Sequence, residues 1–281
     1  MTRRRRLRRT LITGLFSLAL VAGGIYTAVS LVQRSEQLIT EECTAAVGSQ
    51  RADLATDQAA NAALITAVSV RRGLPPRAAS IALATAMQES KLRNIGHGDL
   101  AGPDSRGLFQ QRPSQGWGTQ EQVMDPVYAT NAFYDALVKV PGYATLEITD
   151  AAQRVQRSAY PAAYADHEAM GRSFASALTG ESPAALNCTL RSPDAAGDPA
   201  ALLTQLEASY GSIPTIATGQ TLEVDVSDSY AWSVAHWAVA NAKELSVERV
   251  DVDGKRWDRK ARNGWQDAPD AGGRVAITLA G

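Results

Sequence analysis

The feature that most limits how this chain can fold is an uncharged stretch over residues 10–32, which directly follows six arginines within residues 1–9. At about 1.5 Å per residue, a helix over this stretch is long enough to cross a hydrocarbon core of roughly 30 Å. Basic residues on one flank of such a helix favour keeping that flank in the cytoplasm. We therefore predict a cytoplasmic basic tail at 1–9, a transmembrane helix at 10–32, and a body outside the cytoplasm.

A cleaved signal peptide is the alternative interpretation of the same stretch. Ala28 and Ser30 form a small-x-small pattern of the kind found at signal-peptide cleavage sites. Cleavage there makes the protein secreted, whereas an uncleaved helix makes it a single-pass protein of the plasma membrane. Both interpretations place the rest of the chain outside the cytoplasm.

The body of the protein carries a different charge from the tail. The chain holds 28 Lys and Arg and 29 Asp and Glu, so its net charge is −1. Without the six arginines of the tail, 22 basic residues stand against 29 acidic ones, and residues 10–281 carry −7. A folded nucleic-acid-binding domain normally carries a positive patch or stripe. We therefore exclude nucleic acid as a partner and assign the arginines to membrane orientation.

The chain contains two cysteines, Cys43 and Cys188. Outside the cytoplasm two cysteines most often form a disulfide, which we predict here, and two free thiols are the alternative. The pair encloses a long segment, and we interpret it as marking the limits of a domain. Neither cysteine has a histidine nearby in the sequence, so a thiolate nucleophile has little support.

The residues between the cysteines have the apolar spacing of helices and no strand pattern. Beyond a linker at 191–199 the pattern changes, and β-branched residues alternate with polar ones. Helices are expected at 57–72, 76–90, 126–140, 149–157, 162–178, 200–210 and 229–245, and strands within 221–226, 246–258 and 274–279. The spacing predicts a mainly α domain at 33–190, preceded by one transmembrane helix and followed by a small α/β domain at 200–281.

The chemistry centres on Glu89, near the end of the predicted helix at 76–90. Its neighbours on the same helix face are Ala82, Thr85 and Ala86, which form an apolar stripe. A carboxyl group beside such a stripe loses hydration, and desolvation favours its neutral form. A neutral carboxylic acid is what protonating a glycosidic oxygen requires. A solvated glutamate at a helix end is the alternative.

Glu89-Ser90, Asn94 and the segment GLFQQRP at 107–113 resemble the soluble lytic transglycosylase and goose-type lysozyme superfamily, in particular lysozyme-like secreted or anchored proteins of actinobacteria. Phe109 stands where that family usually has methionine, and GHGDLAGP is inserted before the segment. The resemblance implies that the fold class is a mainly α lysozyme-like domain at 33–190, with peptidoglycan as substrate, Glu89 as catalytic acid and no cofactor. It also implies a tyrosine in contact with the acid, for which Tyr160 is the nearest counterpart.

Several polar or aromatic residues near Glu89 are candidates for contacting a sugar chain through hydrogen bonds or ring stacking. These substrate-binding candidates are Ser90, Ser105, Gln110, Gln111 and Trp117. Asp99 and Asp104 are candidates for a second carboxylate, although Asp104 is also placed to form a turn. The three histidines are scattered along the chain, so no metal site is predicted.

The C-terminal part faintly resembles the fold of zinc-dependent D-alanyl-D-alanine carboxypeptidases. Asp225 matches one residue of that pattern, but no histidine precedes it, and the last strand reads Arg274-Val275-Ala276-Ile277 where His-x-His is expected. The resemblance therefore implies a domain without its zinc ligands. An unrelated α/β domain is the alternative.

These observations predict a membrane-anchored, extracytoplasmic enzyme that cleaves peptidoglycan glycan strands, either as a lytic transglycosylase or as a muramidase. The alternative is a catalytically inactive wall-binding or scaffold protein. The expected partners are peptidoglycan, the membrane through residues 10–32, and other cell-envelope proteins.

Overall fold

The computed structural model describes residues 20–21, 23–24, 26, 36, 38–100, 102–157, 161–269 and 272–281. It divides into two units, Met1–Thr40 and a compact Glu41–Gly281. Among the described residues, no helix is long and apolar enough to cross a membrane. The predicted tail at 1–9 and most of the predicted span at 10–32 lie outside them.

The compact unit begins with a three-stranded antiparallel sheet in the order β2-β1-β3. Its strands are β1 (Glu42–Val47), β2 (Gln50–Ala55) and β3 (Leu186–Thr189). In the register of β1 with β3, Cys43 lies directly opposite Cys188, and the two form a disulfide. The predicted disulfide is confirmed.

The predicted fold class is wrong. Helix accounts for 44% and strand for 19% of the structure, with two antiparallel sheets and no membrane-spanning helix among the described residues. The first sheet lies inside the region 33–190, for which we expected helices alone. Its strands ECTAAV and QRADLA are poor in β-branched residues. They pair because a tight turn and the Cys43–Cys188 register bring them together, and this context overrides local propensity.

The first helices pack around α3, which is buried along most of its length. Gly171 allows α7 to pack closely against α3, because a Cβ atom at this position would lie only 2.8 Å from the carbonyl oxygen of Ser80. The helices of this part are α2 (Thr56–Arg71), α3 (Pro76–Ser90), α4 (Gln120–Met124), α5 (Pro126–Leu137), α6 (Ile148–Gln156) and α7 (Glu168–Leu178), with short 3-10 helices η1 (Pro113–Gln115) and η2 (Pro161–His167).

The C-terminal part is a six-stranded antiparallel sheet in the order β4-β5-β9-β6-β7-β8. Asp253 and Gly254 both have positive φ and form the predicted turn between β6 and β7. The elements are α8 (Pro199–Tyr210), β4 (Thr215–Thr218), β5 (Thr221–Val224), α9 (Asp228–Ala240), β6 (Val247–Val252), β7 (Lys255–Asp258), β8 (Trp265–Asp267) and β9 (Val275–Leu279). The sequence pattern did not predict β4 and β8, which are short and lie at the two edges of the sheet.

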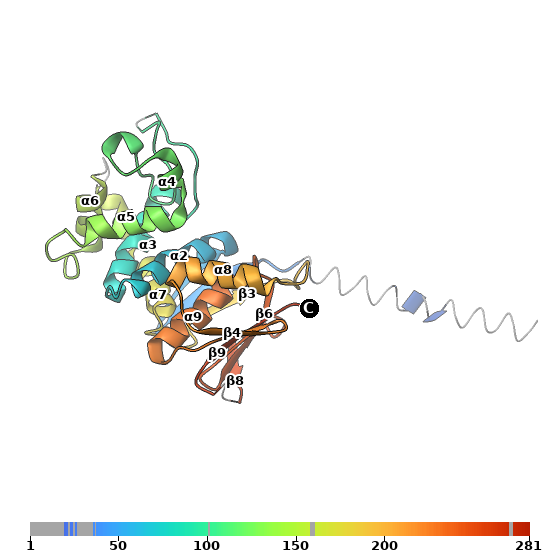
Figure 1. The fold of residues 1–281 in the computed structure, drawn as a ribbon. Coiled ribbons are helices and arrows are strands. Elements are labelled where there is room, and N and C mark those ends of the chain that lie inside the picture. The colour runs from blue at the N-terminus through green and yellow to red at the C-terminus, as the bar shows by residue number, and fades with distance from the viewer. Residues whose placement is uncertain are drawn as a thin grey trace, which may run out of the picture. The chain divides into compact units, whose positions relative to one another are not determined.

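The helical part and the C-terminal sheet share one compact unit. Figure 1 shows α2, α3 and α7 between the α4–α6 part and this sheet. The buried Ser233 of α9 donates a hydrogen bond to the carbonyl of Leu178 at the end of α7 (2.6 Å), and His236 bonds to the carbonyl of Ala177 (2.7 Å). The division at 191–199 into two domains stays a prediction.

The Cys43–Cys188 disulfide gives a first testable expectation. Replacing both cysteines by serine should lower the free energy of unfolding by about 2–5 kcal/mol, because the unfolded chain loses a cross-link over a sequence separation of 145. Thermal unfolding by circular dichroism measures the change. Wild-type protein in reducing agent should show the same loss, and equal melting temperatures for oxidised wild type and double variant would contradict the expectation.

Glu41 gives a second expectation, which concerns pH. Its side chain is 8% exposed, and it pairs with Arg191 (2.7 Å) and Lys243 (2.6 Å). Burial raises the pKa of its carboxyl, but hydrogen bonds from Arg191 and Lys243 outweigh burial and lower the pKa to about 2. The carboxylate therefore stabilises the fold above its unfolded pKa of 4.5, and this stabilisation is lost as pH falls towards about 2.

We expect Glu41→Gln to lower the free energy of unfolding at pH 7 by about 1.5–3 kcal/mol, the usual range for hydrogen bonds to charged groups. The difference from wild type should shrink as pH falls below 4.5. Urea unfolding at several pH values measures this. Glu207→Gln, at an exposed position of α8, is the matched control. A difference that does not depend on pH would contradict the assigned role of the charge.

Candidate functional site

The site lies at the C-terminal end of α3, whose last turn contains Glu89. Lys91 and Leu92 both have φ of 55°, a left-handed conformation that ends the helix abruptly. Leu92 is fully buried, and side chains of α2 bind the two carbonyls: Gln58 donates to that of Lys91 (2.9 Å) and Asn61 to that of Leu92 (2.8 Å). Two side chains of α2 thus hold this strained turn in place. Glu89 lies in the last turn of the helix that it ends.

The loop after α3 folds back onto the helix end. The backbone N–H of Gly107 donates to the carbonyl of Ile95 (2.8 Å), and Asn94 donates to the carbonyl of Met124 (2.8 Å). Gly107 has φ of 77°, and a Cβ atom at this position would overlap the carbonyl oxygen of Val123. This position therefore requires glycine, which explains the Gly of the GLFQ segment.

Ser90 and Gln156 attach the GLFQ segment to the neighbourhood of Glu89. The Ser90 hydroxyl donates to the carbonyl of Leu108 (2.7 Å), and the Gln156 side chain donates to the carbonyl of Phe109 (2.8 Å). Phe109 is fully buried and stacks on the ring of Phe133 with centroids 4.5 Å apart. Two consecutive carbonyls of the segment are therefore held, one by α3 and the other by the end of α6.

Two side chains bind the carboxyl group of Glu89. The hydroxyl of Tyr164, a buried residue of η2, donates to Oε1 of Glu89 (2.7 Å). The side chain of Gln156 forms a hydrogen bond with the same carboxyl group. Glu89 itself is half-buried.

Burial is the dominant influence on the protonation of Glu89. It raises the pKa of the carboxyl, and the hydrogen bonds from Tyr164 and Gln156 lower the pKa only in part, so the net shift is upward. The predicted apolar stripe is present, because Ala82, Thr85 and Ala86 are all fully buried. The protonated form of Glu89 is therefore favoured more than it is in a solvent-exposed glutamate.

The two candidates for a second carboxylate are engaged within the loop. Asp104 accepts hydrogen bonds from Arg112 (2.9 Å) and from the backbone N–H of Ser114 (3.0 Å). The hydrogen bonds from Ser114 and the pairing with Arg112 lower its pKa. Asp99 accepts from the backbone N–H of Gly102 (2.8 Å). Both carboxylates therefore shape the loop, and Asp104 forms the turn that its sequence context allowed.

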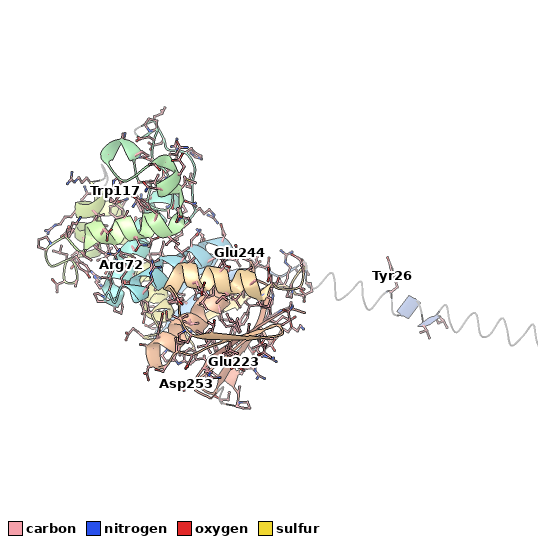
Figure 2. All side chains as sticks on the ribbon, in the orientation of Figure 1. Tyr26, Arg72, Trp117, Glu223, Glu244 and Asp253 are labelled. Carbon is pink, nitrogen blue, oxygen red and sulfur yellow. A yellow bond between two sulfur atoms is a disulfide. The ribbon has the colours of Figure 1, made fainter. Side chains whose placement is uncertain are left out.

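The predicted substrate-binding residues fall into two groups. Ser90 is 2% exposed and Gln111 is 1% exposed, where it donates to the carbonyl of Ala129 (3.0 Å), so both support the loop from beneath. Ser105, Gln110 and Trp117 are half-buried and reach the surface of the same loop region. Figure 2 shows Trp117 in the part of the molecule that carries α4, α5 and α6.

Tyr164 and Gln156 are the site residues that sequence analysis missed. The resemblance implied a tyrosine next to the acid and pointed to Tyr160, which lies outside the described residues. Tyr164 follows four positions later in the same SAYPAAY segment. The path of η2 brings its hydroxyl to Glu89. Gln156 had no sequence signal, because an isolated glutamine at a helix end is common.

Within the part of the chain that the structure describes, no group of three or more His, Cys, Asp or Glu side chains is arranged to hold a metal ion. A scan against models of known protein families finds no match for the chain, and no curated protein matches its sequence. Interpretation of the site therefore depends on its own geometry and on the resemblance of its motifs.

Tyr164 gives a third expectation, about the pH dependence of any reaction in which Glu89 donates a proton. The Tyr164 hydroxyl favours the ionised carboxylate, so Tyr164→Phe should raise the pKa of Glu89 further. The alkaline limb of the pH–rate profile should then move to higher pH. At the optimum the rate should fall by at least about tenfold, since one hydrogen bond to a charged group is lost.

The assay is release of soluble fragments from purified cell walls, measured from pH 4 to pH 9. Tyr143→Phe, which changes a half-buried tyrosine in the turn between α5 and α6, should leave the profile unchanged. Tyr160→Phe tests the residue that the resemblance implied. An alkaline limb that moves to lower pH in Tyr164→Phe would show that the hydroxyl does not act on Glu89 as described.

Proposed function

We propose that the protein cleaves the glycan strands of peptidoglycan with Glu89 as general acid and then general base. The observation that carries the proposal is a half-buried carboxyl group with a raised pKa, held by Tyr164 and Gln156 at the end of a rigid helix. The GLFQ segment, which carries the resemblance to enzymes of this activity, is bonded to the same helix end through Ser90. The motif that carries the resemblance and the carboxyl group with the raised pKa therefore lie at the same end of α3.

The site supplies each proton transfer of such a cleavage. Protonated Glu89 donates its proton to the glycosidic oxygen while the bond between that oxygen and the anomeric carbon breaks. Tyr164 and Gln156 stabilise the carboxylate that this step leaves. The carboxylate then accepts a proton from the hydroxyl group whose oxygen bonds to the anomeric carbon, and Glu89 returns to its starting state.

The attacking hydroxyl group comes either from the sugar itself or from water. Attack by water on the face opposite the leaving group needs a second carboxylate at roughly 6.5–9.5 Å from the acid. Asp104 and Asp99, the candidates for that role, are bonded within the loop. A reaction with one carboxylate fits this arrangement better, so the proposal favours lytic transglycosylase chemistry and an anhydro product over the muramidase reaction.

The proposed location of this activity is outside the cytoplasm. The Cys43–Cys188 disulfide supports it, because such bonds persist in oxidising compartments and are rare in the cytosol. Peptidoglycan is accordingly the proposed partner. The proposal rests on Glu41–Gly281 and does not include a membrane-spanning helix.

The direct test is release of soluble muropeptides from purified cell walls by the full chain. Wild-type protein should release them, and Glu89→Gln should reduce the rate by about 10²–10⁴-fold, the usual contribution of general acid–base catalysis. Glu181→Gln, at an exposed position after α7, is the matched control and should retain the wild-type rate. Mass spectra of the products distinguish anhydro ends from reducing ends.

A folding control accompanies the Glu89 variant. Because the folded-state pKa of Glu89 is raised, ionisation of Glu89 costs stability as pH rises above its unfolded pKa of 4.5. Glu89→Gln should therefore unfold at the same temperature as wild type or a higher one at pH 7. If walls bind tightly to both proteins and neither releases fragments, the protein is a wall-binding scaffold and the enzymatic proposal is wrong.

A further inference from the structure

A hollow of about 760 Å³ lies near the first turn of α3, whereas Glu89 lies near the last. We name it the α3–α7 hollow, since Arg77 and Ser80 of α3 line it together with Glu168 and Arg172 of α7. Its volume falls within the range of small-ligand sites, roughly 300–1,000 Å³. The proposed cleavage reaction makes no use of it.

Charge in the hollow is unbalanced. Nη1 of Arg77 lies 3.4 Å from Oε1 of Glu168, and Nη2 of Arg172 lies 2.5 Å from the same oxygen. Burial raises the pKa of Glu168, but the two arginines outweigh burial and lower it, so this carboxyl is ionised at neutral pH. Two positive groups and one negative group leave a net positive charge. The hollow therefore favours a ligand with one negative charge.

Arg172 is the group best placed to meet such a ligand. Its Nε and Nη2 atoms both bind Glu168, and its side chain stays 56% exposed. Within the described residues no hydrogen bond uses its Nη1 atom. Guanidinium groups bind carboxylates in a planar, two-point geometry. An exposed guanidinium edge beside a net positive charge is suited to a carboxylate.

The hydroxyl groups of the hollow present acceptors. Ser80 donates its hydroxyl proton to the carbonyl of Pro76 (3.2 Å), and Ser173 donates to that of Ala169 (3.0 Å). The oxygen lone pairs of both serines remain able to accept from a ligand N–H. Small apolar side chains complete the wall, among them Val47, Ala165 and Ala169. A peptide offers N–H donors and small methyl side chains for these surfaces.

We infer that the α3–α7 hollow binds a short peptide with small side chains and a free terminal carboxylate, which pairs with Arg172. The acceptors Ser80 and Ser173 receive the peptide N–H groups. This inference concerns a site separate from Glu89 and does not rest on the proposed function. Both a wall peptide with D-residues and an ordinary protein C-terminus carry this chemistry.

Isothermal titration calorimetry with the full chain tests the inference. The probes are N-acetyl-alanyl-alanine as the free acid and as its terminal amide, each in the L,L and the D,D form. At least one acid should bind at least about tenfold more tightly than its amide, because the amide lacks the charge-assisted hydrogen bonds. Preference for the D,D acid identifies wall peptides as the source, and preference for the L,L acid identifies protein C-termini.

Arg172→Met should weaken binding of the acid by at least about tenfold and remove the preference over the amide. Arg154→Met, at an exposed position of α6 away from the hollow, is the matched control and should bind like wild type. Ala169→Phe should block the hollow and abolish binding by steric occupation.

Three results would overturn the inference. They are equal binding of acid and amide, no binding of either acid at millimolar concentration, and equal effects of Arg172→Met and Arg154→Met. Glu89→Gln should bind the peptide like wild type. Peptide binding without release of wall fragments would therefore leave the inference standing while the proposed cleavage fails, and the reverse result would do the opposite.

Discussion

The close packing of α3 against α7 is the interaction on which the rest of the compact unit depends. Gly171 brings the α7 backbone against the α3 carbonyl of Ser80, and every residue of α3 from Ala78 to Ala86 is buried. A helix buried on all sides has little freedom to shift, because protein interiors are close-packed. Glu89 lies in the last turn of this helix, so its backbone has little freedom to move. The C-terminal sheet contributes through α9, which is bonded to the end of α7 through Ser233.

Glu89 shows how one carboxyl group is kept between two protonation states. Burial against the apolar stripe disfavours its charge, and the hydrogen bonds from Tyr164 and Gln156 favour it. The proposed cleavage needs both influences, because in it Glu89 donates a proton and later takes one back. The backbone strain at Lys91 and Leu92 fits this interpretation, since residues in left-handed conformations persist where the surroundings hold them for a purpose.

Local patterns predicted the parts of the fold that depend on neighbouring residues. Pro75 and Pro76 fixed the start of α3, and the spacing of Ala82, Thr85 and Ala86 predicted the burial of Glu89. The β1–β3 sheet was not predictable in this way. Its strands lack a β-type pattern, and β1 pairs with β3, which lies more than a hundred residues later in the chain.

The residues of the candidate site also differ in whether local sequence predicts them. Glu89 and the GLFQ segment could be found from residue type and spacing, since each lies within one local element. Tyr164 and Gln156 could not, because their role depends on how η2 and α6 pass the end of α3. The contact between Tyr164 and Glu89 follows only from the three-dimensional path of the chain.

The Cys43–Cys188 bond has a consequence for how the protein withstands proteolysis. Nearly all of the helical part, including α3, α6 and η2, lies within the covalent ring that this bond closes. A protease that cuts any single peptide bond inside the ring leaves both fragments joined through sulfur. The exposed loop around Leu100 is the natural place for such a cut. The nicked chain would keep Glu89 and Tyr164 in one molecule, and two cuts would be needed to release a fragment.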